Sequence, residues 1–306
     1  MKKNEEINEN IEFPWQKPKS SSEDPRAPEE VQAIMDNPSY ILPVEDSDFI
    51  KSDEARGVRL QLDYLKAEIK LQEYGVESTI VVFGSARVME RESAIEKLAA
   101  IQNKLEESGE SVELFDELTI AETMVRKSYY YDEARKFGQL VGKSGENPDD
   151  CRVTIMTGGG PGIMEAANRG AFDVGAKSIG LNIQLPHEQF PNPYITPGLC
   201  FQFHYFAIRK LHFMRRAKAL VVFPGGFGTL DEFFETITLI QTKKYPLLPI
   251  VLVCQKYWSR VIDFEFLKEE GVITSQDLDL FAFAEDAEEA WSEILKWHEV
   301  HQSPLF

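Results

Sequence analysis

Three segments of this chain place glycine and other small residues directly after an apolar stretch. They are Gly84-Ser85-Ala86-Arg87, Thr157-Gly158-Gly159-Gly160-Pro161-Gly162 and Pro224-Gly225-Gly226-Phe227-Gly228-Thr229. Each precedes a predicted helix, and the free N–H groups and the dipole at the start of a helix favour an anion. A single glycine turn is often explained by packing alone, but two glycine triads at neighbouring strand ends predict a phosphate-binding crevice.

Two familiar nucleotide-binding patterns fit these segments poorly. In a Walker A loop the last glycine precedes Lys and then Ser or Thr, whereas Gly228 precedes Thr229-Leu230-Asp231. In the dinucleotide fingerprint a third small residue follows the second glycine by three positions, but Gly158 and Gly160 lead to Ile163. We therefore do not expect an ATPase, and the sequence gives NAD binding little support.

Charged residues cluster around the third glycine segment. A basic group precedes it and an acidic group follows it: Arg209, Lys210, Arg215, Arg216 and Lys218, then Asp231, Glu232 and Glu235. Cations suit the end of a helix and carboxylates suit its start, so a solvated helix face explains Arg215, Arg216 and Lys218. The dipole explanation is weaker for the acids, because a carboxylate beside a phosphate site repels the ligand. A carboxylate there is easier to explain if it acts on the sugar of a phosphorylated ligand.

The composition limits the partners of this chain. It has 306 residues, 43% of them hydrophobic, and a formal net charge of -18, so it can bury a core but repels polyanions. We expect neither nucleic acid polymers nor membranes as partners, and a small phosphate ester would need a local cluster of donors. Three widely spaced cysteines, a polar N-terminus and apolar runs far shorter than a spanning helix predict a reduced, cytoplasmic protein.

Short apolar strands alternate with helices from residue 78 onward. The predicted strands cover residues 78–85, 152–157, 178–183, 217–223 and 248–253. The predicted helices cover residues 91–107, 118–141, 204–217, 229–241, 258–269 and 287–300, and a further helix starts near Pro161. This alternation predicts an α/β fold, a Rossmann-like doubly wound parallel sheet with helices on both faces. Such folds bind ligands at the carboxyl ends of their strands.

The N-terminal part is predicted to extend this fold. Residues 1–50 are polar and rich in Glu, Asn, Lys, Ser and Pro, which predicts a partly disordered arm. Residues 51–77 carry apolar positions at helical spacing and predict an amphipathic helical lead-in. The sheet and the crevice are expected in the domain formed by residues 78–306.

The third glycine segment and its surroundings resemble a known family. Pro224 to Glu232 matches the PGGxGTxxE signature of the LOG family, and Arg209-Lys210 followed by Met214 resembles the family's upstream RKxxM element. Thr157 to Met164 is similar to the family's GGGxxGxM turn, and Phe83 to Ala86 is similar to its first-strand loop. The resemblance covers roughly residues 78–256. Members are named after the plant protein Lonely Guy and are often labelled lysine decarboxylases.

This resemblance implies a fold, an activity and a partner. It implies a Rossmann-like catalytic domain over residues 78–306 that forms a homodimer or a higher homo-oligomer. It implies a nucleoside 5′-monophosphate phosphoribohydrolase, which binds a small-molecule nucleotide and releases the free base and ribose 5-phosphate. The wording TGGGPGIMEAANRG, with Glu165 in it, is closer to the longer bacterial members, some of which cleave ordinary purine or pyrimidine monophosphates. Cytokinin-type nucleotides are the other substrates that the resemblance allows.

The chemistry of such an enzyme assigns roles to particular residues. Cleavage passes through an oxocarbenium-like ribose, which needs negative charge near C1′, an oriented water and help for the departing base. We expect Glu232 to supply the charge and orient the water, and Arg209 to bind the phosphate or the base. The other expected substrate-binding residues are Ser85, Arg87, Gly158, Gly159, Gly160, Glu165, Lys210, Gly225, Gly226, Gly228, Thr229 and Asp231.

The scheme requires no metal and no other cofactor, and the five histidines lack the spacing of a zinc site. Two alternatives belong to other classes. A non-catalytic nucleotide sensor would keep the glycine loops but would need neither Glu232 nor Arg209. A pyridoxal phosphate decarboxylase would need a lysine for its Schiff base, and no lysine adjoins either glycine triad in the sequence.

Overall fold

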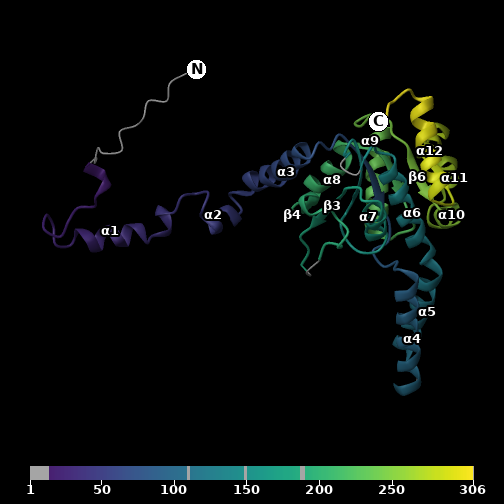
Figure 1. The fold of residues 1–306 in the computed structure, drawn as a ribbon, viewed down its shortest axis with the longest axis horizontal. Helices are drawn as coiled ribbons and strands as arrows, with labels where there is room; N and C mark the ends of the chain where they lie inside the picture. The colour runs from purple at the N-terminus through teal and green to yellow at the C-terminus, as the bar shows by residue number, and fades with distance from the viewer. Residues whose placement is uncertain (1–13, 109–110, 148–149, 187–189, 306) are drawn as a thin grey trace. The chain divides into compact units, whose positions relative to one another are not determined.

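The computed structural model describes residues 14–108, 111–147, 150–186 and 190–305 (Figure 1). The chain divides into two compact units, one ending at Gln61 and one beginning at Leu62. The first unit holds η1 (Pro14–Gln16), α1 (Ala27–Met35), η2 (Pro38–Tyr40), α2 (Ser47–Lys51) and the start of α3 (Arg56–Glu73). The described part of the expected polar arm therefore contains helices. Residues 1–13 of that arm lie outside the described residues, and the predicted domain limits remain predictions.

The second unit is built on a seven-stranded sheet in which every neighbouring pair of strands is parallel. The strands are β1 (Ser78–Phe83), β2 (Val153–Thr157), β3 (Ser178–Ile183), β4 (Cys200–Phe203), β5 (Ala217–Val222), β6 (Ile250–Val253) and β7 (Ala282–Ala284). Their order in the sheet is β4-β3-β2-β1-β5-β6-β7. The sequence prediction of a doubly wound parallel sheet is confirmed, and the order reverses beside β1, between β1 and β5.

Helices cover both faces of this sheet because alternate strand residues point to opposite sides. Ile80 and Val82 of β1 belong to one apolar core, together with residues of α6, α7 and α12. Val81 and Phe83 belong to the other core, together with residues of α3, α8, α9 and α10. The strands are therefore buried on both faces, which is why they are apolar throughout rather than alternating.

The helices of the second unit agree with the prediction except at two points. After α3 come α4 (Arg91–Ser108), α5 (Val112–Lys127), α6 (Tyr129–Lys143), α7 (Ile163–Asp173), η3 (Pro197–Leu199), α8 (Phe206–Arg215), α9 (Phe227–Gln241), α10 (Gln255–Val261), α11 (Phe264–Glu269), η4 (Ser275–Leu280) and α12 (Ala287–Val300). The single helix predicted over residues 258–269 is wrong, because residues 262–263 separate α10 from α11. The single helix predicted over residues 118–141 is wrong as well, because the helix is interrupted between α5 and α6. Ser128 lies fully buried at the break, and its hydroxyl donates to the Val125 carbonyl at 2.8 Å.

Two short strands were also missed by the sequence analysis. β4 has four residues and β7 has three, and they form the two edges of the sheet. Segments of this length give almost no periodic signal, so only their pairing with β3 and β6 makes them strands. Among the described residues, none of the helices combines the length and the apolar character needed to cross a membrane.

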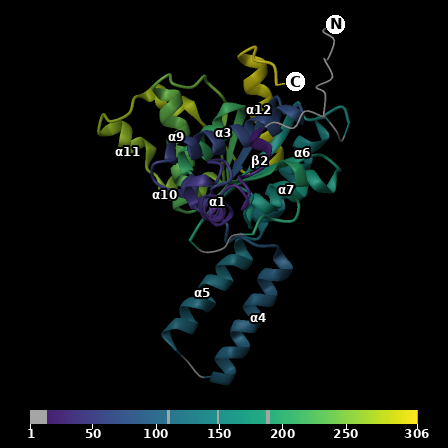
Figure 2. The same cartoon turned by 90° about the vertical axis from the view of Figure 1, so that its left-hand side faces the viewer.

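Helices α4 and α5 lie side by side as a hairpin that projects from the sheet and its covering helices (Figure 2). Ala94 and Ile101 of α4 and Ala121 of α5 are buried. Ser111 begins α5 as its N-cap, accepting a hydrogen bond from the Leu114 N–H at 3.2 Å. Lys127, the last residue of α5 and of the hairpin, lines the main pocket.

Candidate active site

The largest described pocket lies where the carboxyl ends of β1 and β5 meet, at the reversal of strand order. Its volume is about 700 Å³, which is within the range of small-molecule sites. Residues from all three glycine segments line it, as the sequence analysis expected. The lining residues among those predicted are Ser85, Arg87, Gly158, Arg209, Gly225, Gly226, Gly228, Thr229 and Glu232.

The three glycine segments are bonded to one another. The Ser85 N–H donates to the Pro224 carbonyl at 3.1 Å, and the Ser85 carbonyl accepts from the Ile163 N–H at 3.1 Å. Gly162 has φ +77°, and a Cβ there would lie 2.3 Å from the Ser85 carbonyl oxygen. Glycine at position 162 is therefore required by this close backbone approach, which holds the second glycine segment against Ser85, a residue that lines the pocket.

The start of α9 forms one wall of the pocket. Gly226, Phe227 and Gly228 are exposed there, and nothing lies within 4 Å of a Cβ built at either glycine. Gly225 is tightly packed, since a Cβ would lie 2.1 Å from Thr229 Oγ1. Because the first N–H groups of a helix have no partner within the helix, this open end is suited to an anion.

Glu232 and Arg209 meet inside the pocket. Their side chains are 7% and 15% exposed, and Arg209 Nη2 lies 3.8 Å from Glu232 Oε1. Burial raises the pKa of Glu232 to about 7, although the nearby Lys210 and Arg209 pull that pKa downward. Burial also lowers the pKa of Arg209. A buried carboxyl that ionises near neutral pH in a pocket is a physical sign of a functional group.

Aromatic rings hold the Arg209 guanidinium in place. Its Cζ lies 5.0 Å from the centroid of the Phe206 ring and 5.6 Å from that of Phe213. Its Nε is buried and has no hydrogen-bond partner among the described residues. Arg209 therefore has donor capacity left for a ligand.

The match to the family's RKxxM element is off by one residue. That element would place its methionine at Phe213, one residue before Met214.

The charge inside the pocket is opposite to the charge of the whole chain. Arg87, Lys127 and Arg209 line the pocket, and Glu232 is the only carboxylate among the described lining residues. The formal net charge of the chain is -18. The local cluster of donors that a phosphate ester would need in so acidic a protein is therefore present.

Several predicted site residues lie outside this pocket. Lys210 is paired with Asp231 at 2.8 Å and with Glu235 at 2.6 Å, so these charges neutralise one another, and none of the three lines the pocket. Glu165 accepts a hydrogen bond from the Tyr131 hydroxyl at 2.7 Å and lines an adjoining cavity of about 510 Å³. The two cavities share Ala86, Arg87 and Met124.

Gly159 and Gly160 also lie outside the pocket and are buried. Gly159 has φ +71°, and a Cβ there would lie 2.0 Å from Asn182 Oδ1. The Asn192 N–H donates to the Gly159 carbonyl at 2.9 Å, and Asn192 Nδ2 donates to the Gly160 carbonyl at 3.1 Å. These two glycines shape the loop, and their contact with a ligand stays a prediction.

Sequence reasoning missed residues that the fold brings into the pocket. Lys127, at the end of α5, and Tyr257, on α10, both line it, although neither lies near a glycine segment in the sequence. The Tyr257 hydroxyl donates to the Gly225 carbonyl. The sequence around Lys127 gave the signal of one continuous helix, and neither position belongs to a glycine or charge motif. No lysine adjoins the glycine triads in the sequence, but in the folded protein Lys127 lines the same pocket as residues of both triads.

A cluster of three acidic residues could also be considered as a metal site. Glu133, Asp286 and Glu288 place carboxylate oxygens within 4.8 Å of one another, outside the main pocket. Glu133 accepts from the Ala287 N–H at 2.8 Å, and Glu288 pairs with Lys136, so these acids already serve the start of α12.

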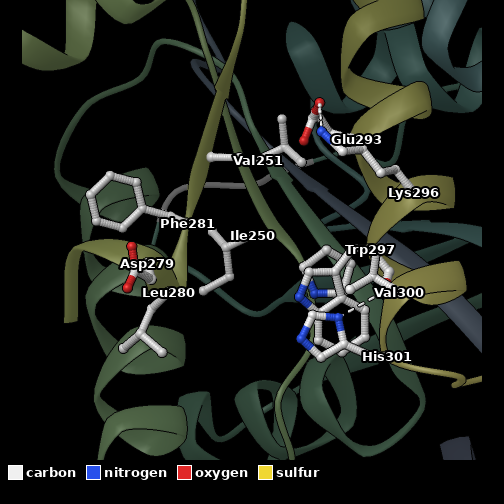
Figure 3. Close-up of a pocket in the computed structure, with 12 residues that line it drawn as sticks. Ile250, Val251, Asp279, Leu280, Phe281, Glu293, Lys296, Trp297, Val300 and His301 are labelled. Atoms are coloured by element: carbon white, nitrogen blue, oxygen red, sulfur yellow. Dashed lines mark hydrogen bonds and ion pairs between the residues drawn. The ribbon is translucent and has the colours of Figure 1, made fainter. Parts of the chain in front are cut away.

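A smaller cavity of about 220 Å³ lies at the other end of the sheet, where β6 and β7 begin (Figure 3). Ile250, Phe281 and the stacked rings of Trp297 and His301 line it, the two ring centroids being 4.0 Å apart. Residues of the three glycine segments do not reach it. Its lining includes the carboxylates of Asp279 and Glu293, and Lys296 already pairs with Glu293 at 3.6 Å, so the cavity is a poor match for a phosphorylated ligand.

The fold and the main pocket define the class: a Rossmann-like α/β protein with a locally cationic pocket at the switch point of its parallel sheet. A family model described as "possible lysine decarboxylase" matches residues 164–294. This model and the curated relatives below support the resemblance to the LOG family.

Curated relatives match part of this chain. A cytokinin riboside 5′-monophosphate phosphoribohydrolase of Arabidopsis thaliana is 26% identical over 183 residues, 58% of this chain and 80% of the relative. One of Oryza sativa is 30% identical over 119 residues, 38% of this chain and 45% of the relative.

Among solved structures, the Moco carrier protein of Chlamydomonas reinhardtii is 17% identical with a TM-score of 0.42, covering 73% of this chain and 99% of that one. The molybdenum cofactor binding protein of Rippkaea orientalis is 19% identical with a TM-score of 0.40, covering 55% of this chain and 86% of that one. Scores this low decide nothing about the ligand of the present chain.

Proposed function

We propose that this protein hydrolyses the N-glycosidic bond of nucleoside 5′-monophosphates, releasing the free base and ribose 5-phosphate. The observation that carries the proposal is Glu232, a buried carboxyl with a pKa of about 7, placed beside Arg209 at the open start of α9. The relatives' activity on cytokinin riboside monophosphates supports the same reaction class.

The pocket divides into parts that match the parts of such a substrate. The 5′-phosphate would lie against the N–H groups at the start of α9 and the Thr229 hydroxyl. The ribose would then extend toward Glu232, one helical turn further into α9. Apolar side chains of Ile183, Leu185 and Phe206 line the same pocket and could cover the face of a base.

Glu232 in its ionised form would do two things in the reaction. Its charge would stabilise the oxocarbenium-like ribose as the C1′–N bond breaks, and its oxygen would accept a proton from the attacking water. The water oxygen becomes the new hydroxyl on C1′, and the departing base nitrogen gains a proton in place of its lost bond. Arg209 would donate to the phosphate or to the base, and its buried site strengthens either interaction.

The direct test is a panel of purine, pyrimidine and cytokinin monophosphates incubated with the purified protein, with released base measured by chromatography. We expect base and ribose 5-phosphate in equal amounts from at least one monophosphate, and far slower release from the matching nucleoside. Binding of monophosphates without any released base would contradict hydrolysis and would instead support the nucleotide sensor.

The decarboxylase label of the family model requires a separate check because Lys127 lines the pocket. A pyridoxal phosphate enzyme would hold the cofactor as a Schiff base on a lysine, which gives a visible absorption band. We expect the purified protein to show no such band, even after incubation with pyridoxal phosphate. A band lost on Lys127→Gln would favour the decarboxylase.

A further inference from the structure

Lys127 lies at the end of α5 and lines the main pocket. The helix is interrupted at the buried Ser128, and α6 begins at Tyr129. Lys127 therefore lines the same pocket as Glu232, although Glu232 follows it by more than a hundred residues in the chain.

Lys127 is linked to the glycine loop through one aromatic ring. Its Nζ lies 5.7 Å from the centroid of the Tyr257 ring, and the Tyr257 hydroxyl donates to the Gly225 carbonyl. The loop that carries the open start of α9 is thus fixed by the ring over which the ammonium lies. Lys127 and the start of α9, with its free N–H groups, thus line one pocket and are connected through Tyr257.

The cations of this region differ in whether a carboxylate already neutralises them. Lys210 has two carboxylate partners, and Arg209 has Glu232 at 3.8 Å. Lys127 and Arg87 both line the pocket and have no carboxylate within 4.0 Å among the described residues, and of the two Arg87 is exposed whereas Lys127 is partly buried. A partly buried ammonium without a counter-ion in an acidic protein gains most from a phosphate dianion.

We propose that Lys127 binds the 5′-phosphate of the substrate together with the start of α9, and that it determines the preference for nucleotides over nucleosides. The inference rests on the proposed function for the identity of the substrate. It leaves Arg209 free to act on the sugar or the base, because a separate cation then holds the phosphate.

The experiment compares Lys127→Gln with Lys127→Arg and with the matched control Arg126→Gln. Arg126 lies one residue earlier on α5, is exposed and donates to Thr123 Oγ1 at 2.8 Å, and does not line the pocket. Both Gln variants remove one positive charge from the last turn of the same helix. We measure kcat and KM for AMP and for adenosine, and the Kd of ribose 5-phosphate by calorimetry.

For Lys127→Gln we expect kcat/KM for AMP to fall about 10- to 100-fold, mostly through KM, with kcat/KM for adenosine unchanged. The Kd of ribose 5-phosphate should rise by a similar factor, Lys127→Arg should recover most of the loss, and Arg126→Gln should behave as the wild type. Equal values of KM for AMP and Kd for ribose 5-phosphate in the two Gln variants would overturn the proposal. An equal loss on AMP and adenosine would overturn it too, since it would show support of the pocket rather than phosphate binding.

The two proposals fail in different ways. If the wild type releases no base from any monophosphate, the proposed function fails, while the ribose 5-phosphate affinities of the three variants still decide the role of Lys127. If the wild type cleaves AMP and Lys127→Gln cleaves it equally well at low concentration, only the role of Lys127 fails.

Discussion

Glu232→Gln separates a catalytic carboxylate from one that merely complements the start of a helix. The change is nearly isosteric and removes the charge. If Glu232 only complemented the helix dipole, its loss would lower the free energy of unfolding by well under ~1 kcal/mol and leave hydrolysis intact. The buried position of Glu232 predicts a different result, in which the variant is more stable than the wild type at high pH.

The size of that gain follows from the pKa of Glu232. Its ordinary value is 4.5, and burial raises it to about 7. Between these two values the folded state binds more protons at this site than the unfolded state does, so the stability of the wild type falls as pH rises. At 1.36 kcal/mol for each pKa unit, the ionised carboxylate costs about 3 kcal/mol above pH 7. Gln has no such cost, and the two proteins should be equally stable below pH 4.5.

Urea unfolding at a series of pH values measures this difference, with Asp231→Asn as the control. Asp231 lies one residue away but is 59% exposed and pairs with Lys210, so its loss should change stability little and without this pH dependence. In the same preparations Glu232→Gln should lower kcat on a monophosphate roughly 10²-fold or more, about 3 kcal/mol of transition-state stabilisation, while nucleotide binding persists. A stability difference that does not vary with pH, or equal small kinetic effects of the two substitutions, would refute the reasoning.

Three further results are expected. Because ionised Glu232 is the active form and its pKa is raised to about 7, kcat/KM should rise with pH through about 7, and a flat profile from mildly acidic to mildly basic pH would argue against this role. Gly225→Ala should lower the free energy of unfolding by about 1–3 kcal/mol, since its Cβ would lie 2.1 Å from Thr229 Oγ1, whereas Gly226→Ala, with nothing within 4 Å, should not; denaturant titration of both compares them. Deletion of residues 1–30 should leave turnover nearly unchanged, and a large loss with an unaltered oligomeric state would show that the arm contributes to the pocket.

Local patterns in the sequence were sufficient for the fold class and for the centre of the pocket. The strands β1, β2, β3, β5 and β6 are continuous apolar runs, and their alternation with helices already implied a parallel sheet. The glycine segments follow three of these strands directly. Because parallel strands end at one edge, the segments had to gather there whatever the detailed packing.

Contacts between distant residues decided the rest. Glu68 on α3 forms a buried ion pair with Arg216, Nη1 to Oε2 at 2.8 Å, which lowers the pKa of Glu68 to about 2, so Arg216 is not on the solvated helix face expected for it. Lys210 belonged to a basic motif, yet it pairs with two carboxylates and does not line the pocket.

Lys127 carried no motif and nevertheless lines the pocket at the end of α5, together with residues about a hundred positions later in the chain. Residue types and local spacing determine which elements form and where glycine is needed. Which charges remain without a partner, and which way they point, depends on long-range packing that no stretch of sequence contains.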